Sequence, residues 1–183
     1  SVIPAVPVVI RRANVADAAA IAAVRVDSWR TTYRGVIPRN YLDEMEVDES
    51  TALWTRVLSA GSNKACVFVA EINGEIVGFS AGQMLEEPKF GCNAELAAIY
   101  LRSNAQRQGV GRRLVSMVAD AHQAHGATGL LVWVIAANKV ARQFFEQLGA
   151  GLQIEQPFTW DELELTEVGY CWRDLEELQK ACQ

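Results

Sequence analysis

The chain has 183 residues, a length that fits one domain with a sizeable core. Half of its residues are apolar and 21% are charged, which is a globular rather than a disordered balance. The formal net charge of −5 argues against a protein that binds nucleic acid by neutralising phosphates. No apolar run is long enough to span a membrane, and residues 1–9 lack the charged start and apolar core of a signal peptide.

The cysteines and histidines show no metal or redox motif. None of the four cysteines forms a Cys-x-x-Cys pair, so we expect reduced thiols and a cytoplasmic protein. Cys66 and Cys171 lie in apolar segments and are predicted to be buried, whereas Cys182 is predicted to be an exposed thiol. His122 and His125 lack a companion ligand at a useful spacing, so we expect solvent-facing or helix-end histidines and no bound metal.

Hydrophobic periodicity and turn residues define the expected elements. In chain order they are a strand over 8–12, helices over 18–29 and 48–58, strands over 66–72, 75–83 and 95–101, a helix over 109–125, a strand over 130–136, a helix over 139–148 and a closing hairpin of strands over 152–160 and 164–173. The continuously apolar run 130–136 is typical of a strand buried on both faces, often in a parallel pair. The predicted architecture is α/β, with a mixed, mostly antiparallel sheet that contains one internal parallel βαβ unit, in a single domain over 1–183.

Several local features refine these elements. Asn14 or Asp17 is expected to cap the first helix, and Asn73-Gly74 predicts a tight hairpin turn. The polar segment 86–89 predicts a break after the third strand. The helical spacing of the second helix turns three apolar side chains toward the core: Leu53, Trp54 and Val57.

The chain is organised around the segment Gln106-Arg107-Gln108-Gly109-Val110-Gly111-Arg112, between a predicted strand and a predicted helix. Glycines allow a sharp turn and a close approach of the backbone to a ligand, and the unpaired N–H groups of a helix start bind anions. The segment therefore predicts a pyrophosphate site, although glycines needed only for turn geometry would leave the same pattern. It lacks the Gly-Lys-Ser/Thr of a nucleotide-hydrolysing loop and the three-glycine frame of a dinucleotide site.

Two flanking motifs make the interpretation more specific. The segment 94–101 (Ala-Glu-Leu-Ala-Ala-Ile-Tyr-Leu) precedes the loop, and Asn138-x-x-Ala141-x-x-Phe144-Phe145-x-x-x-Gly149 follows the next strand. In this order and spacing, the three motifs resemble those of the GNAT superfamily of acyl-CoA-dependent N-acetyltransferases. The resemblance covers about residues 8–174 and implies transfer of an acetyl group from acetyl-CoA to an amine, without a metal.

The resemblance also implies roles for individual residues. Glu95 would be the general base, and its apolar neighbours are expected to make the carboxylate a better base; the competing interpretation is a structural carboxylate paired with an arginine. A backbone N–H of the segment 99–101 would bind the oxyanion. The expected acetyl-CoA contacts are Ile99, Tyr100, Leu101, Gln106, Arg107, Gln108, Gly109, Val110, Gly111, Arg112, Asn138, Ala141, Phe144 and Phe145.

The chain departs from the superfamily at the residue that would protonate the CoA thiolate as it leaves. Many members of the superfamily have tyrosine where this chain has Phe145, which has no proton to give. Tyr100 or Tyr33 could substitute, or the thiolate could leave unprotonated. Ser103 and Arg107 also replace residues common in the superfamily, without removing a backbone donor.

The acceptor is left open by the sequence. Trp29 and Tyr33 stand four residues apart and so share a helix face, either as core residues or as an aromatic wall of the acceptor site. We expect a primary amine of a small molecule or of a peptide N-terminus. A homodimer is plausible for this superfamily. The alternatives are a non-catalytic acyl-CoA-binding protein of the same fold and, less favoured, a nucleotide-binding module.

Overall fold

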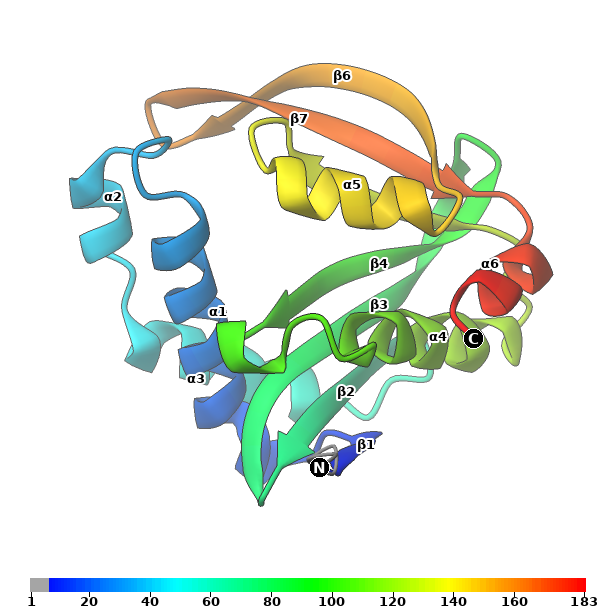
Figure 1. The fold of residues 1–183 in the computed structure, drawn as a ribbon, viewed down its shortest axis with the longest axis horizontal. Coiled ribbons are helices and arrows are strands. Elements are labelled where there is room, and N and C mark those ends of the chain that lie inside the picture. Colours follow the sequence, from blue (N-terminus) through cyan, green and yellow to red (C-terminus); the bar gives the residue numbers. More distant parts are fainter. Residues whose placement is uncertain (1–6) are drawn as a thin grey trace, which may run out of the picture. The chain divides into compact units, whose positions relative to one another are not determined.

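The computed structural model describes residues 7–183 (Figure 1). Most of the segment 1–9, for which we predicted no signal peptide, lies outside the described residues. The elements are β1 (Val8–Arg12), η1 (Val15–Asp17), α1 (Ala18–Thr32), α2 (Arg39–Asp43), α3 (Val47–Ser59), β2 (Ala65–Ile72), β3 (Glu75–Lys89), β4 (Cys92–Leu101), η2 (Ser103–Ala105), α4 (Val110–Gln123), β5 (Leu130–Ile135), α5 (Lys139–Gln147), β6 (Gly151–Trp160), β7 (Leu163–Trp172) and α6 (Leu175–Ala181). No helix among the described residues is long and apolar enough to cross a membrane.

The seven strands follow one another in the sheet in the order β1-β2-β3-β4-β5-β7-β6. β4 and β5 form the parallel pair, with Ala94–Leu96 opposite Leu130–Val132. β7 runs antiparallel to both β5 and β6, and β1 runs antiparallel to β2. The predicted fold class, a mostly antiparallel mixed sheet with one parallel pair, is therefore confirmed.

The chain divides into two compact units. Of the described residues, the first contains 7–62 together with Val67–Ser80 and Ala98–Leu114, and the second contains Asn63–Cys66, Ala81–Ala97 and Val115–Gln183. The single domain over 1–183 stays a prediction.

In the first unit, α1 and α3 bury apolar side chains against each other and against the sheet. Trp54 of α3 meets Phe79 edge to face, with ring centroids 5.1 Å apart. The buried line of α3 runs through Ser50 and Trp54, four residues apart. Leu53 and Val57 flank this line on its solvent side and are 47% and 38% exposed, so the prediction that they face the core was wrong.

An ionic network fixes the start of the first unit. The Asn14 side chain accepts from the N–H of Ala16, and Asp17 accepts from the N–H of Asn14, which completes a capping box at η1. Arg11 of β1 donates to Asp17 at 2.8 and 2.9 Å and to Glu71 of β2 at 2.6 Å. The hydrogen bonds from Arg11 hold the pKa of Asp17 below its usual range, although burial acts in the opposite direction.

In the second unit, α5 lies along the β6–β7 hairpin (Figure 1). Phe145 of α5 is buried and packs edge to face on Trp172, with ring centroids 5.8 Å apart. Asn138 accepts from the N–H of Ala141 and begins α5, as predicted. α6, which was not predicted from the sequence, buries Leu175 and Leu178.

Other expectations were wrong. β3 continues through the polar segment to Lys89, because those side chains are exposed there and the turn comes only at Phe90 and Gly91, with φ of 54° and 80°. His122 lies in the last turn of α4, one of the two expected positions, but it is buried rather than solvent-facing, with Nε2 3.3 Å from the Sγ of Cys66. Cys182 caps α6 and is buried rather than exposed.

Candidate functional site

The glycine-containing loop leads directly into α4, within the first unit. Arg107 and Gly109 have φ of 65° and 75°, in the left-handed region where a side chain is disfavoured. The backbone therefore turns sharply before Val110, the first residue of α4. The N–H groups of the first helical turn have no intrahelical acceptor, and they lie at the positive end of the helix dipole.

Side chains of this loop donate hydrogen bonds to nearby backbone carbonyls, and its arginines give it positive charge. The Gln106 amide donates to the carbonyl of Leu101 at 3.4 Å, and the Gln108 amide donates to the carbonyl of Asn104 at 3.0 Å. The basic side chains of the loop are exposed: Arg107, Arg112 and Arg113. This arrangement can bind an anion through backbone donors and mobile cations.

An aromatic cluster also belongs to the first unit. Trp29 and Tyr33 of α1 have ring centroids 4.7 Å apart, and Nε1 of Trp29 donates to the hydroxyl of Tyr100 at 2.8 Å. The guanidinium of Arg25 lies 5.5 Å from the Trp29 ring. Burial raises the pKa of Tyr100 above its ordinary value, while the Trp29 bond and the charge of Arg25 act in the opposite direction. Tyr33 is buried and Trp29 is half-buried, so the Tyr33 side of this cluster belongs to the core.

A small pocket of about 100 Å³ lies between α1 and the segment that follows β4. Its lining is mostly polar: Asp27, Ser28, Thr31, Thr32, Leu101, Arg102, Ser103 and Gln106. Asp27 accepts a hydrogen bond from Nη1 of Arg102. The Oγ of Ser28 and the Nε of Arg102 are buried and have no hydrogen-bond partner among residues 7–183. These two groups are available to a ligand or to water.

The proposed base lies in the second unit. Glu95 is half-buried on β4, and its Oε2 accepts a hydrogen bond of 2.5 Å from the amide of Gln83 on β3. The sequence did not point to Gln83, because a pairing across the β3–β4 hairpin leaves no short-range signal. The contact fixes one carboxylate oxygen and leaves the other able to accept a proton.

The residues of the last motif also lie in the second unit. Asn138 caps α5, Ala141 supplies the capped N–H, and Phe144 is half-buried. Phe145, in contrast, is 2% exposed and lies in the core of this unit. Arg142, which we had not singled out, donates to the hydroxyl of Tyr170 at 2.9 Å.

The predicted site residues therefore form two groups. The first unit contains Trp29, Tyr33, Ile99, Tyr100, Leu101, Gln106, Arg107, Gln108, Gly109, Val110, Gly111 and Arg112, and the second contains Glu95, Asn138, Ala141, Phe144 and Phe145. Within the first group the structure joins Trp29 to Tyr100, and within the second it joins Asn138 to Ala141.

Comparison with known proteins identifies the family. The model of the acetyltransferase (GNAT) family matches residues 24–150. The uncharacterized N-acetyltransferase YuaI of Bacillus subtilis is 36% identical over 173 residues, which cover 94% of this chain and 96% of YuaI. The chain belongs to the GNAT acetyltransferase family.

Solved structures show the same fold. The PaiA N-acetyltransferase of Thermoplasma acidophilum, crystallised with coenzyme A, has a TM-score of 0.70 at 19% identity, with 88% of this chain and 98% of that chain covered. YncA of Salmonella typhimurium, whose structure contains acetyl-CoA, has a TM-score of 0.66 at 21% identity, with 91% and 94% covered.

Proposed function

We propose that the chain is an N-acetyltransferase that moves an acetyl group from acetyl-CoA to a primary amine. The observation that carries the proposal is the loop before α4, where a left-handed turn at Arg107 and Gly109 opens into a helix start ringed by arginines. That loop suits a pyrophosphate, and the chain belongs to a family of acetyltransferases. The coenzyme A and acetyl-CoA complexes of PaiA and YncA support the same donor.

In this proposal, the segment Gln106–Arg112 binds the pyrophosphate. Backbone N–H groups at the start of α4 donate to its oxygens, and Arg107 and Arg112 neutralise part of its charge. The segment Ile99–Leu101 pairs with the pantetheine arm as an added strand, and one of its N–H groups donates to the thioester oxygen. Asn138, Ala141 and Phe144 line the arm from α5.

Glu95 serves as the general base, directly or through a water molecule. The acceptor amine is protonated at neutral pH and must lose a proton before its nitrogen can attack the thioester carbonyl. Gln83 supports this role, because its hydrogen bond holds the carboxylate in one orientation. The nitrogen then forms a bond to the carbonyl carbon, the oxygen becomes an oxyanion, and the carbon–sulfur bond breaks.

The leaving thiolate needs a proton or must depart without one. Phe145 cannot supply a proton, and its side chain is in the core. The hydroxyl of Tyr100 accepts from Trp29 and donates to no acceptor among the described residues. Because burial raises its pKa, Tyr100 keeps this proton at neutral pH. We propose Tyr100 as the proton donor, with a thiolate that leaves unprotonated as the competing case.

The acceptor is proposed to be an amine of a small molecule or a peptide N-terminus, with the Trp29 and Tyr33 rings as its aromatic wall. Cationic acceptors are favoured by aromatic faces, although Arg25 already occupies part of the Trp29 surface. We further propose a cytoplasmic location, consistent with four cysteines that form no disulfide among the described residues.

The substitution Glu95→Gln tests the proposal against a non-catalytic acyl-CoA-binding protein. The assay measures CoA release with a panel of amines, and calorimetry measures acetyl-CoA binding by the same samples. An enzyme with this base loses about 10²- to 10⁴-fold in kcat and retains binding. Binding without turnover by the parent protein, over the whole amine panel, would favour the non-catalytic alternative.

A further inference from the structure

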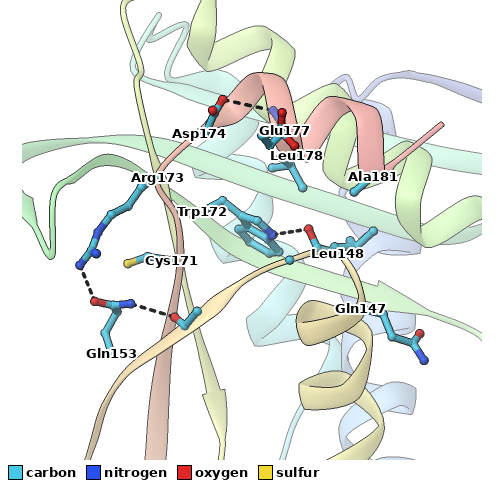
Figure 2. Close-up of a pocket in the computed structure, with 12 residues that line it drawn as sticks. Gln147, Leu148, Gln153, Cys171, Trp172, Arg173, Asp174, Glu177, Leu178 and Ala181 are labelled. Carbon is cyan, nitrogen blue, oxygen red and sulfur yellow. Dashed lines mark hydrogen bonds between the residues drawn. The ribbon is translucent and has the colours of Figure 1, made fainter.

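A pocket in the second unit lies between the start of β6, the end of β7 and α6 (Figure 2). Its volume is about 510 Å³, within the range of about 300–1,000 Å³ that small-molecule sites occupy. None of the residues that line it is among the predicted site residues. α6, which forms one wall, comes after residues 24–150, the part of the chain that the family model matches. The pocket is therefore a candidate for a second binding site.

One part of the pocket is apolar. Its apolar side chains are Leu148, Trp172, Leu178 and Ala181. Nε1 of Trp172 donates to the carbonyl of Leu148 at 3.1 Å, so the polar atom of the indole is already satisfied within the protein. Figure 2 shows Leu178 on one side of the Trp172 ring and Arg173 on the other. An aliphatic group beside Leu178 would remove apolar surface from water and would need no hydrogen bond.

Arg173 supplies a positive charge that is held in place. Its Nε donates to the carbonyl of Phe90 at 3.0 Å, and its Nη2 donates to the Oε1 of Gln153 at 2.6 Å. Gln153 is itself oriented, because its amide donates to the carbonyl of Gly151 at 3.1 Å. The Nη1 of Arg173 has no acceptor among residues 7–183, and all of the acceptors of this guanidinium are uncharged. A carboxylate can bind at Nη1 with little further loss of side-chain freedom.

Asp174 supplies a negative charge that is also held at one end only. Its Oδ1 accepts from the N–H groups of Glu176 and Glu177 at 3.0 and 3.2 Å, which begins α6. Its Oδ2 has no donor among the described residues. Glu177 also lines the pocket, but its carboxylate lies 3.3 Å from the Nζ of Lys180. The Oδ2 of Asp174 is therefore the oxygen that is available to a cation.

The two charges belong to different walls of the pocket. Figure 2 shows the Arg173 side chain extending toward Gln153 on β6, whereas the Asp174 carboxylate lies at the start of α6. Although Arg173 and Asp174 are consecutive in the chain, they form no ion pair with each other. A ligand with a single charge can satisfy only one of them. A ligand with a carboxylate at one end and an ammonium group at the other can satisfy both.

We propose that this pocket binds a short zwitterion with an aliphatic side chain, of the chemical class of the dipeptides. Its carboxylate accepts from the Nη1 of Arg173, its ammonium group donates to the Oδ2 of Asp174, and its side chain packs beside Trp172 and Leu178. A dipeptide suits the two walls better than a single amino acid, because its peptide unit separates the two charges. The site does not depend on the proposed acetyl transfer.

Titration of glycyl-leucine into the isotope-labelled protein without acetyl-CoA, followed by nuclear magnetic resonance, tests the proposal. We expect saturable shifts that include the indole N–H signal of Trp172, with a Kd on the order of 1 mM for a ligand of this size. Three analogues each lack one feature: N-acetyl-glycyl-leucine has no ammonium group, glycyl-leucinamide has no carboxylate, and glycyl-glycine has no aliphatic side chain. Each should bind about three- to fivefold more weakly.

Variants locate the bound dipeptide, which is needed because peptide N-termini are also among the proposed acceptors. Arg173→Gln and Asp174→Asn should each weaken binding of glycyl-leucine about three- to fivefold. Asparagine caps a helix as well as aspartate does, so Asp174→Asn retains the start of α6. Arg56→Gln on α3 and Glu162→Gln in the β6–β7 turn make the same changes of charge at exposed positions outside the pocket, and both should bind like the parent.

Circular dichroism confirms that each variant is folded. The proposal is overturned if the folded parent shows no saturable binding up to about 10 mM glycyl-leucine. It is also overturned if all three analogues bind as tightly as glycyl-leucine, or if Arg173→Gln and Asp174→Asn bind like the parent, because the dipeptide then occupies another site. Titration of the same samples with acetyl-CoA reports separately on the proposed donor site, so either proposal can fail without the other.

Discussion

The indole of Trp29 donates a hydrogen bond of 2.8 Å to the hydroxyl of Tyr100 and so joins α1 to the end of β4. Phe79 lies against the same tyrosine, with ring centroids 5.5 Å apart. The hydroxyl proton of Tyr100 has no acceptor among residues 7–183. Tyr100 lies two residues before Arg102, at the start of the segment that leads to α4. The pair gives the first unit both a structural contact and a candidate proton donor.

The substitution Tyr100→Phe should lower stability in a pH-dependent way. Loss of the hydrogen bond is expected to cost about 0.5–1.5 kcal/mol of unfolding free energy at pH 7. Because burial raises the pKa of Tyr100, the folded protein holds the phenolic proton more tightly than the unfolded chain does. The stabilisation that comes from the protonated Tyr100 is therefore fully present below the ordinary tyrosine pKa of about 10. It is lost as the pH rises through the higher pKa of the folded protein.

Urea unfolding at pH 8 and at about pH 11 measures this effect. The parent should lose more stability over this interval than Tyr100→Phe does. Tyr41→Phe, which makes the same chemical change in α2, serves as the control. Equal losses in the parent and in Tyr100→Phe would contradict the assignment.

Phe145→Tyr tests whether position 145 can supply a proton in this chain. The side chain packs against Tyr170 and Trp172 in the core, so a hydroxyl there would be buried without a designed partner. We expect a loss of about 1–3 kcal/mol in unfolding free energy and no gain in kcat. Phe144→Tyr, on the half-buried neighbour, should change stability little. A higher kcat in Phe145→Tyr would show that this position does reach the reacting sulfur.

Asp17→Asn should destabilise the first unit at neutral pH by about 1–3 kcal/mol, because it weakens two bonds from Arg11 and one from the Asn14 N–H. The pKa of Asp17 is lowered by Arg11, so its contribution is present above the ordinary value of about 3.9. It is lost as pH falls through the lower folded pKa. Chemical unfolding should thus show a gap between parent and variant at pH 7 that closes near pH 2.

An exposed ion pair is the matched control for Asp17. On α2, Oδ2 of Asp43 lies 3.4 Å from Nε of Arg39, and both side chains are largely exposed to water. We expect Asp43→Asn to change stability by less than about 0.5 kcal/mol at either pH. An effect of Asp43→Asn as large as that of Asp17→Asn would mean that net charge, not the network, sets the pH dependence.

Gln83→Met should separate positioning of Glu95 from binding of the donor. Methionine has a similar length and no N–H, so the 2.5 Å bond to the carboxylate is lost. We expect kcat to fall about tenfold, which corresponds to about 1.4 kcal/mol, with the Kd for acetyl-CoA unchanged. Gln83→Asn, which retains an amide, should recover part of the loss. A parallel change in Kd would indicate a structural role instead.

Elements governed by local rules were predictable from the sequence. The left-handed turn at Gly109, the Asn73-Gly74 hairpin and the Asn138 cap each depend on a few adjacent residues. The parallel pair followed from one continuously apolar run opposite the strand before the loop. The acetyltransferase family followed from three spaced motifs and is confirmed by the family match.

Features set by tertiary packing were not predictable. His122 is buried because Gly82 makes room for it: a Cβ at Gly82 would lie 2.6 Å from its Nε2. The contact of Gln83 with Glu95 joins residues that share no pattern in the sequence.

The most direct test of the central claim is calorimetric titration of acetyl-CoA into the parent protein, Gly109→Val and Gly126→Val. Both glycines have positive φ, 75° and 93°, so valine strains the backbone at each, but only Gly109 belongs to the proposed pyrophosphate loop. The proposal predicts saturable binding by the parent and by Gly126→Val, with a Kd between about 1 µM and 1 mM, and at least tenfold weaker binding by a folded Gly109→Val. Absence of binding by the folded parent, or equal losses in both variants, would contradict it.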